Sequence, residues 1–335
     1  MEDVMGKTVL AFDIGDTYIK IAKQEKDRIR IICKQMPEDL VKDGIVQLPH
    51  MLEEFLKDIR KEYKLPKAEC GIVVPDEEVV CRKLTLPAMT EKQLEVNLPF
   101  EFSDFISGKP TRYVYDYAME QIIEDESGKP KEMVLTGAVM SKDAVTNYVD
   151  MFRTAGFKLR TLIPQEIALT NIIKEAVANN RIDPDQEFCL VNLGHRATQV
   201  YIFRGETLVV LRKIYIGGES IDKAIAEHEI IDEYLARTHK NTNYNDVLES
   251  EYCKEAFGKI AVEIMKVINF YKFNNRESNL EDIYFCGGGS NILQLCDHIA
   301  AVNGLDHQPI NRLLPINADK NMDLSAVCAM GVLLQ

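Results

Sequence analysis

Basic residues are scarce in this sequence relative to acidic ones. The 335 residues include 40 Lys and Arg against 53 Asp and Glu, which gives a formal net charge of −13 at pH 7. Nucleic acids and anionic membrane surfaces attract proteins through clustered positive charge. The charge balance therefore predicts a protein that binds no nucleic acid and does not bind a membrane surface directly.

Long apolar runs, targeting signals and paired cysteine motifs are also missing. No stretch approaches the roughly 18 apolar residues that a membrane-spanning helix needs, and no N-x-[ST] sequon occurs. The eight cysteines form no C-x-x-C pair, and most lie in apolar stretches where a reduced thiol packs as a small hydrophobe. The first residues, MEDVMGK, are acidic rather than led by Lys or Arg. These absences predict a cytoplasmic, reduced protein without direct membrane insertion.

Two common nucleotide-binding patterns are absent as well. The tripeptide Gly6–Thr8 imitates the end of a P-loop, but the glycine that a P-loop requires upstream is missing. The run that starts at Gly287 is not G-x-G-x-x-G, because Ile292 stands where the last glycine belongs. The sequence therefore argues against a P-loop and a Rossmann nucleotide site.

Two similar hairpin patterns are present, one in each half of the chain. Each pattern consists of a strand, a turn and a second strand, and each turn contains a polar residue, an apolar residue and a glycine in that order. The two stretches are VLAFDIGDTYIKIAK (9–23) and FCLVNLGHRATQVYIF (188–203). Helical patterns follow each of them, as expected for mixed sheets covered by helices. We therefore predict a duplicated α/β molecule.

The first hairpin carries side chains that suit a phosphate with Mg²⁺. Gly15 lets the backbone approach a ligand closely, and successive N–H groups in such a turn bind anions. Thr17 adds a hydroxyl donor, Lys20 a cation, and Asp13 a carboxylate that can reach Mg²⁺ through water. Taken alone, the same stretch also fits an ordinary solvated β-turn.

The segment between the first strands and the middle of the chain differs in character. It contains a strand, a helix opened by Thr90, two strands joined by the turn EDESGKP, and a helix closed by Gly156. This pattern predicts a small α+β insertion. The predicted organisation is a first lobe (1–83), an inserted subdomain (84–154), a return to the first lobe (155–186), a second lobe (187–320) and a C-terminal helix that packs on the first lobe (321–335).

The order of these motifs resembles the actin-like ATPase superfamily and, within it, the PilM family of type IV pilus assembly proteins, in the FtsA-like branch. The similarity covers essentially the whole chain and rests on RKLTLPAMTEKQLEVNLPFEF, FRTAGFKLRTLIPQEIALTNII, RKIYIGGESIDKAIA and VINFYKFNNRESNLEDIYFCGGGSNI. The resemblance implies an actin-like (ribonuclease H-like) duplicated fold, with two lobes around a nucleotide cleft and an inserted α+β subdomain.

The resemblance also implies a site for ATP or ADP with Mg²⁺. In it, Asp13 would hold hydrated Mg²⁺, and Gln165 would orient the attacking water. A helix-opening Gln165 bonded to backbone and a surface-turn His195 are the alternative interpretations of these two residues. The implied nucleotide-binding residues are Asp13, Gly15, Asp16, Thr17, Lys20, Gly194, His195, Arg196, Thr198, Gly217, Gly218, Gly287, Gly288, Gly289 and Ser290.

The second hairpin departs from the family pattern at Asn192, where most relatives carry Asp. Asn cannot act as a base, and it removes one negative charge from the surroundings of the metal. Binding through backbone amides would survive this replacement. We therefore expect nucleotide binding with weak or absent ATPase activity, and Arg196 offers positive charge to a terminal phosphate.

For partners, the resemblance implies that the insert helps to bind the N-terminal cytoplasmic tail of an inner-membrane PilN-like protein. The chain would then be a scaffold at the inner face of the plasma membrane, with other pilus proteins as further partners and self-association left open. The insert offers apolar side chains for such a tail, although they would also suit its own core: Pro87, Leu94, Leu98, Phe100, Phe102 and Phe105.

Two other functions are compatible with the superfamily. A small-molecule kinase would need a catalytic carboxylate near the terminal phosphate, and the second hairpin has none. An FtsA-like cell-division protein or cytomotive filament is the other alternative. FtsA relatives carry an amphipathic membrane helix after the fold, whereas this sequence stops at VLLQ, which favours a scaffold anchored through a partner.

Overall fold

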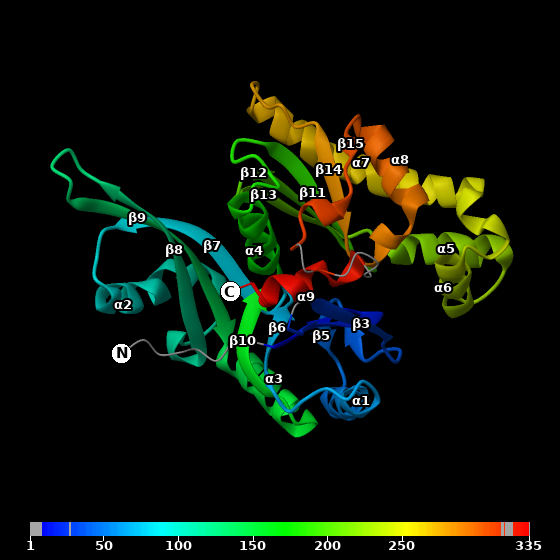
Figure 1. Cartoon of the computed structure of the whole chain (residues 1–335), viewed down its shortest axis with the longest axis horizontal. Coiled ribbons are helices and arrows are strands. Elements are labelled where there is room, and N and C mark those ends of the chain that lie inside the picture. Colours follow the sequence, from blue (N-terminus) through cyan, green and yellow to red (C-terminus); the bar gives the residue numbers. More distant parts are fainter. Residues whose placement is uncertain (1–8, 27, 316–317, 319–323, 335) are drawn as a thin grey trace.

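Two five-stranded mixed sheets form the centres of two lobes in the computed structural model, which describes residues 9–26, 28–315, 318 and 324–334 (Figure 1). In the first lobe the strand order is β10-β6-β1-β2-β3. These strands are β1 (Leu10–Ile14), β2 (Tyr18–Gln24), β3 (Ile29–Gln35), β6 (Glu69–Val74) and β10 (Lys158–Pro164). A two-stranded hairpin lies beside them, formed by β4 (Val41–Lys42) and β5 (Ile45–Val46).

The second lobe repeats this arrangement with the order β13-β12-β11-β14-β15. In both lobes the first strand, β1 or β11, is antiparallel to the strand that follows it and parallel to a later strand, β6 or β14. The predicted duplication is thus present in the strand pairing. The strands are β11 (Glu187–Leu193), β12 (Thr198–Arg204), β13 (Thr207–Ile214), β14 (Asp282–Cys286) and β15 (Asp306–His307).

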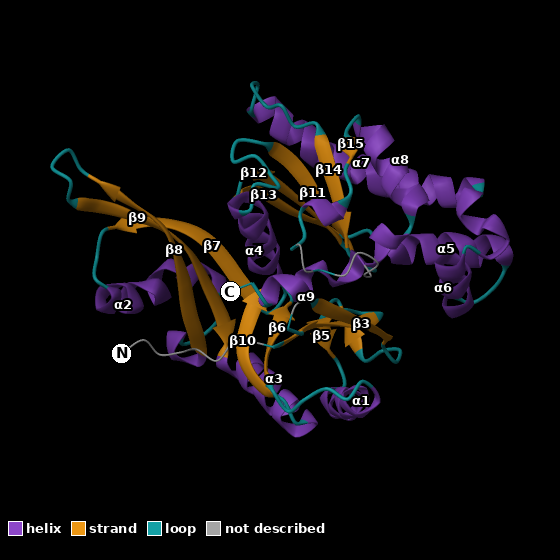
Figure 2. Ribbon diagram, viewed as in Figure 1, coloured by secondary structure: helices purple, strands orange, loops and turns teal. Residues whose placement is uncertain are grey.

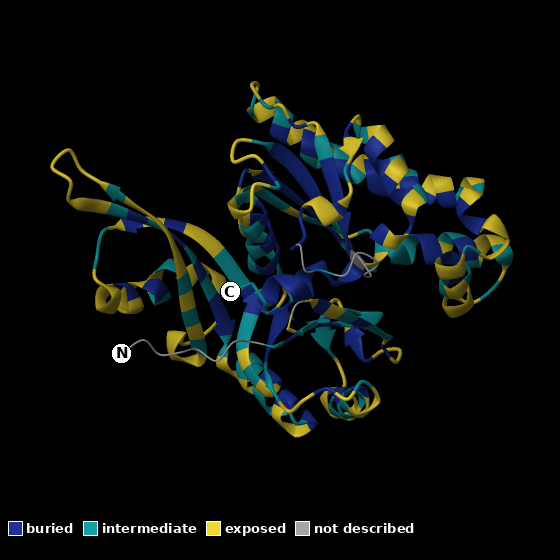
Figure 3. Ribbon diagram, viewed as in Figure 1, coloured by how far each residue is buried: buried dark blue, intermediate teal, exposed yellow. Residues whose placement is uncertain are grey.

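Helices cover the sheets, so the central strands are buried (Figure 3). This burial explains why β1 and β11 are nearly continuous apolar runs rather than alternating patterns. The first-lobe helices are α1 (Pro49–Glu62), α3 (Lys142–Ala155) and α4 (Gln165–Ala178). The second-lobe helices are α5 (Gly218–Glu229), α6 (Glu233–Thr242), α7 (Glu251–Asn274) and α8 (Leu293–Asn303).

One apolar core joins the two lobes. Side chains of α4 and of the last helix, α9 (Val327–Val332), pack between the sheets and contact Ala11 on one side and Phe188 and Tyr201 on the other. Helix α9 lies against α4, β1 and β6, which are all parts of the first lobe. The lobes therefore share a buried connection below the cleft that separates their hairpins.

The insert is a three-stranded antiparallel sheet with one covering helix (Figure 2). Its strand order is β7-β9-β8, with β7 (Val79–Pro87), β8 (Tyr113–Glu124) and β9 (Pro130–Ser141). Helix α2 (Glu91–Glu101) begins after Thr90, as predicted, because the Thr90 N–H donates to Gln93 Oε1 at 2.9 Å in a capping box. The two predicted strands around the turn EDESGKP form the β8–β9 hairpin.

Half of the apolar side chains considered for partner binding belong to the core of the insert instead. Leu94, Leu98 and Phe102 are buried between α2 and the sheet. Their position follows from α2 lying on the sheet, which the sequence pattern alone did not settle. Pro87, Phe100 and Phe105 are exposed, so these three side chains remain available at the surface.

The remaining elements are short. Within the polar stretch THKNTNYND, α6 ends at Thr242, and a 3₁₀ helix follows before α7. Among the described residues, no helix is long and apolar enough to cross a membrane. The 3₁₀ helices are Ser103–Phe105, Pro110–Arg112, Tyr244–Glu249, Gly288–Asn291, Ile310–Arg312 and Leu324–Ala326.

Candidate functional site

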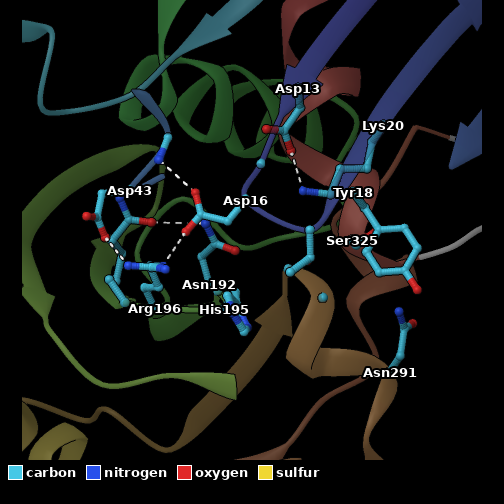
Figure 4. A pocket seen from close by; sticks show the side chains of 18 of the residues that line it. Asp13, Asp16, Tyr18, Lys20, Asp43, Asn192, His195, Arg196, Asn291 and Ser325 are labelled. Atoms are coloured by element: carbon cyan, nitrogen blue, oxygen red, sulfur yellow. Dashed lines mark hydrogen bonds and ion pairs between the residues drawn. The ribbon is translucent and has the colours of Figure 1, made fainter. Parts of the chain in front are cut away.

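A cavity of about 570 Å³ lies between the lobes, where the two hairpins face each other (Figure 4). The end of α6 and the glycine run after β14 complete its wall. Twelve of the residues proposed from the sequence line this cavity: Asp13, Gly15, Asp16, Thr17, Lys20, Gln165, Asn192, Gly194, His195, Arg196, Gly287 and Gly288.

In the first hairpin, Asp13 and Lys20 lie opposite each other in the β1–β2 ladder. Lys20 Nζ donates to Asp13 Oδ2 at 3.3 Å, and both side chains are largely buried. Although burial disfavours the charged ammonium, the Asp13 carboxylate raises the pKa of Lys20 above its usual value. The Gly15 N–H donates to the Tyr18 carbonyl at 3.1 Å and closes the turn.

Asp16 connects the first hairpin to the second. Its Oδ1 accepts the Gly44 N–H at 2.8 Å, and its Oδ2 lies 3.4 Å from Arg196 Nε. Arg196 also lies 4.0 Å from Asp43 (Figure 4). Glu219 lies 3.6 Å from the same guanidinium. Burial raises the pKa of the Asp16 carboxyl, against the opposing effects of the Gly44 hydrogen bond and the Arg196 charge.

The Arg196 guanidinium is held by charges rather than by tight hydrogen bonds. Its Nε is buried, and no hydrogen-bond partner meets it among the described residues. Charge-assisted hydrogen bonds from Arg to a carboxylate are usually about 2.7–2.9 Å long, whereas all three ion pairs of Arg196 are longer. The three carboxylates therefore surround the Arg196 charge without fixing the guanidinium through a short hydrogen bond.

Gln165 and Asn192 meet through a residue that the sequence analysis missed, Gln199. Asn192 Nδ2 donates to Gln199 Oε1 at 3.0 Å, and Gln165 Nε2 donates to the same oxygen and to Tyr201 Oη at 3.0 Å. Gln199 Nε2 in turn donates to Asp76 Oδ2 at 2.6 Å. Gln165 is thus bonded to side chains rather than to backbone.

His195 is not the surface-turn residue of the alternative interpretation, because only 11% of its side chain is exposed. Burial, together with the Arg237 and Lys240 charges, lowers its pKa to about 3, so the imidazole is neutral at pH 7. The fully buried Asp222 lies 2.5 Å from Lys240 Nζ and 3.3 Å from Arg237 Nε. The sequence analysis also missed this cluster behind the second hairpin.

The glycine run after β14 brings the backbone close to the second hairpin. Gly287 has φ +82° and ψ 173°, and a Cβ there would lie 2.2 Å from Asn192 Oδ1. Only glycine adopts this conformation readily. The residues that follow form a 3₁₀ helix before α8 begins at Leu293.

Five proposed nucleotide-binding residues lie behind the cavity wall, namely Thr198, Gly217, Gly218, Gly289 and Ser290. The Thr198 hydroxyl donates to the Ile216 carbonyl at 2.8 Å, and the Ser290 hydroxyl donates to the Gly287 carbonyl at 2.7 Å. Gly217 packs against the second hairpin, where a Cβ would lie 2.5 Å from the Gly194 carbonyl oxygen. These residues shape the turns rather than line the cavity.

The donor set of the cavity suits Mg²⁺ held with a nucleotide. Within the described ranges, no group of three or more His, Cys, Asp and Glu side chains is placed to hold a metal ion. Mg²⁺ at nucleotide sites keeps several waters and binds one or two carboxylates together with phosphate oxygens. The carboxylate of Asp13, which lines the cavity, fits this requirement.

Solved structures with the same fold support the architecture. The chain is 20% identical to one in a PilM–PilN type IV pilus biogenesis complex, with a TM-score of 0.81 and 97% of both chains covered. The chain is 14% identical to the ethanolamine utilization protein EutJ from Carboxydothermus hydrogenoformans, with a TM-score of 0.60. That match covers 97% of this chain and 88% of EutJ. The chain is 12% identical to MreB5 of Spiroplasma citri bound to ADP, with a TM-score of 0.50. That match covers 96% of this chain and 94% of MreB5.

These likenesses confirm the predicted actin-like, two-lobed α/β fold. A comparison with curated proteins finds no match. The sequence profile of the family described as type IV pilus assembly protein PilM matches residues 11–328, which is nearly the whole chain. The chain therefore belongs to the PilM family of type IV pilus assembly proteins.

Proposed function

We propose that this chain binds ATP or ADP with Mg²⁺ between its lobes and acts as a nucleotide-dependent scaffold in type IV pilus assembly. The observation that carries the nucleotide proposal is the cavity between the hairpins, which both turns, Lys20 and Arg196 line together. The MreB5 structure, which has the same fold and holds ADP, supports it.

The roles of the residues follow from their places around the cavity. The phosphates lie against the N–H groups of the two hairpin turns, with Lys20 and Arg196 as cations, and the nucleoside lies toward Gly287, Gly288 and the end of α6. Asp13 would hold Mg²⁺ through water, and the metal would neutralise phosphate charge. Thr198, Gly217, Gly218, Gly289 and Ser290 support these turns from behind.

Hydrolysis in this proposal is slow, because an amide stands at the end of β11. Asn192 donates to Gln199 and offers no carboxylate to the metal or to a water. The same feature disfavours a small-molecule kinase, which needs a catalytic carboxylate there. The family match likewise favours a pilus scaffold over an FtsA-like filament protein.

For the partner, we propose the N-terminal cytoplasmic tail of an inner-membrane PilN-like protein, and the solved PilM–PilN complex supports this choice. The sheet face of the insert opposite α2 is the surface we assign to it. Glu120 on this face lies 2.7 Å from Lys83 and accepts a hydrogen bond from Thr136. The charge of Lys174 on α4 also acts on Glu120, so this face is polar and lies toward α4.

Binding of such a tail would hold the chain at the inner face of the plasma membrane. The predicted division into lobes and insert belongs to the same proposal, with residues 84–154 as the partner-binding subdomain. Other pilus proteins and further copies of the chain are its remaining partner classes.

A peptide titration tests the partner assignment. A synthetic peptide with the N-terminal residues of the accompanying PilN-like protein should bind the chain saturably. Thr136→Arg, which places a large cation at the centre of the assigned face, should weaken binding by about tenfold or more. Phe100→Ala, on the exposed side of α2, is the control and should bind normally. Equal binding by Thr136→Arg and wild type would reject this surface.

A further inference from the structure

Gln199 and Asp76 have no role in the function described above, yet they connect the polar side chains of both lobes. We propose that Asp76, in the first lobe, fixes the side-chain amide of Gln199, in the second, and that Gln199 thereby holds Gln165 in position to orient the water that hydrolyses ATP. This inference rests on the proposed nucleotide site and adds two positioning residues to it.

The strand pairing places these residues together. Gln199 lies directly opposite Asn192 in the β11–β12 ladder. Gln165 begins α4 immediately after β10, and Asp76 follows β6, which is parallel to β10. Because the carboxyl ends of parallel strands meet at one edge of a sheet, Asp76 and Gln165 approach the cleft from the same edge. All four side chains line the cavity.

The hydrogen bonds define the orientation of each amide. Gln199 Oε1 accepts from Asn192 and Gln165, while Gln199 Nε2 donates to Asp76 at 2.6 Å. A carboxylate only accepts hydrogen bonds, so it selects the orientation in which the NH₂ group faces the first lobe. If the Gln199 amide were reversed, its NH₂ group would face the NH₂ groups of Gln165 and Asn192. Its carbonyl oxygen would then face the Asp76 carboxylate. Asp76 therefore determines the direction of all three amides.

Within the part of the chain that the structure describes, the Gln165 carbonyl oxygen accepts no hydrogen bond. The Gln165 NH₂ group donates to Gln199 and to Tyr201, so its carbonyl oxygen remains to accept a hydrogen bond from a water in the cavity. In hydrolysis, the water oxygen forms a bond to the terminal phosphorus. The bond from that phosphorus to ADP breaks, and its electron pair leaves with ADP. One water proton stays on the attacking oxygen, and the other passes to another oxygen of the phosphate product. Gln165 orients the water and takes no proton itself.

The arrangement also depends on how the lobes are placed. Asp76 and Gln199 belong to different lobes, and the neighbouring ion pair between Glu77 and Lys213 spans the same gap. Gln199 is only 7% exposed, so water competes little with its hydrogen bonds. Gln165 is therefore oriented only while the lobes are closed.

A reciprocal exchange of the two groups tests the inference. Gln199→Glu places a second carboxylate against Asp76, and two adjacent carboxylates do not both ionise readily. Asp76→Asn removes the group that selects the amide direction. In the double variant, the new amide donates to the new carboxylate, which again accepts from Gln165 and Asn192. The double variant thus restores the original pattern of hydrogen bonds, with the carboxylate charge now in the second lobe instead of the first.

The pH dependence of the Gln199→Glu variant gives a second readout. As the pH falls, one of the two carboxyl groups, that of Asp76 or that of the new glutamate, should take up a proton and donate a hydrogen bond to the other. The rate of phosphate release by this variant should therefore be higher at pH 5.5 than at pH 8. Burial already raises the pKa of Asp76, against the effects of Gln199 and Lys213. The other titratable groups that act on or respond to Asp76 are Glu77, Glu166, Cys81, Tyr201 and Cys328.

Phosphate release from Mg·ATP is the measurement. Wild type should release phosphate slowly, each single variant about tenfold more slowly, and the double variant within about threefold of wild type. Lys92→Ala, at an exposed position on α2 away from the cavity, should keep the wild-type pH profile. The inference is overturned if the single variants match wild type, if the double variant is no faster than the slower single variant, or if Gln199→Glu does not recover at low pH. Nucleotide binding without any release would reject this inference alone, and absence of binding would reject the proposed function.

Discussion

Individual charged residues around the cleft are arranged in pairs of opposite sign. Asp13 pairs with Lys20 inside the first hairpin, and Asp16 pairs with Arg196 between the hairpins. Burial of a charge is costly unless a partner offsets it, so these pairs explain how two carboxylates fit next to Gly15 in a half-buried turn. The sequence analysis named only Mg²⁺ as a partner for Asp13. The structure adds the protein's own cations.

His195 provides a prediction at this scale. Its pKa is about 3 in the fold against 6.5 when unperturbed, so the unfolded chain takes up its proton first as pH falls. The contribution of this neutral imidazole to stability is complete above about pH 6.5 and is lost toward pH 3. At pH 5 the loss amounts to about 2 kcal/mol.

Urea unfolding at pH 7 and pH 5 measures the effect. Between pH 7 and pH 5, the free energy of unfolding should fall by about 2 kcal/mol less in His195→Asn than in wild type. His50→Asn, which changes an exposed histidine, should lose as much as wild type. Equal losses in wild type and His195→Asn would show that His195 does not titrate in this way.

At the scale of elements, the hairpins and glycine turns were predictable because their signals are local. The strand, turn and strand around Gly15 and the capping box at Thr90 are each contained in a few consecutive residues. The contact of Gln199 with Asp76 and Gln165 was not predictable, because it depends on how three distant segments meet. Gln199 carried one usable signal, its position opposite Asn192 in the expected hairpin.

The turn after β14 gives a prediction for an element. Gly287→Ala should lower the midpoint of thermal unfolding, because the conformation at φ +82° and ψ 173° costs a residue with a Cβ about 1–3 kcal/mol and because that Cβ would meet Asn192. Gly288→Ala is a matched control in the same turn, since its Cβ would meet nothing within 4 Å. Equal midpoints for the two variants would contradict the assigned backbone conformation.

At the scale of the whole molecule, the lobes are joined in two different ways. Helices α4 and α9 link them through a shared apolar core, whereas the contacts across the cleft are polar, namely Asp16 with Arg196, Asp76 with Gln199, and Glu77 with Lys213. When the cleft opens, the separated polar groups regain hydrogen bonds to water, but separation of the core would expose apolar surface. Opening at the cleft therefore costs less than separation at the core, which suits a site that admits a ligand.

Calorimetric titration of Mg·ATP tests the central claim that the cleft binds a nucleotide. The account predicts saturable binding by wild type, and binding about tenfold or more weaker for Lys20→Gln, which keeps a hydrogen-bond donor toward Asp13 but removes the charge. Lys92→Ala, at an exposed position on α2, should bind as wild type does. No binding by folded wild-type protein, or equal binding by Lys20→Gln, would contradict the account.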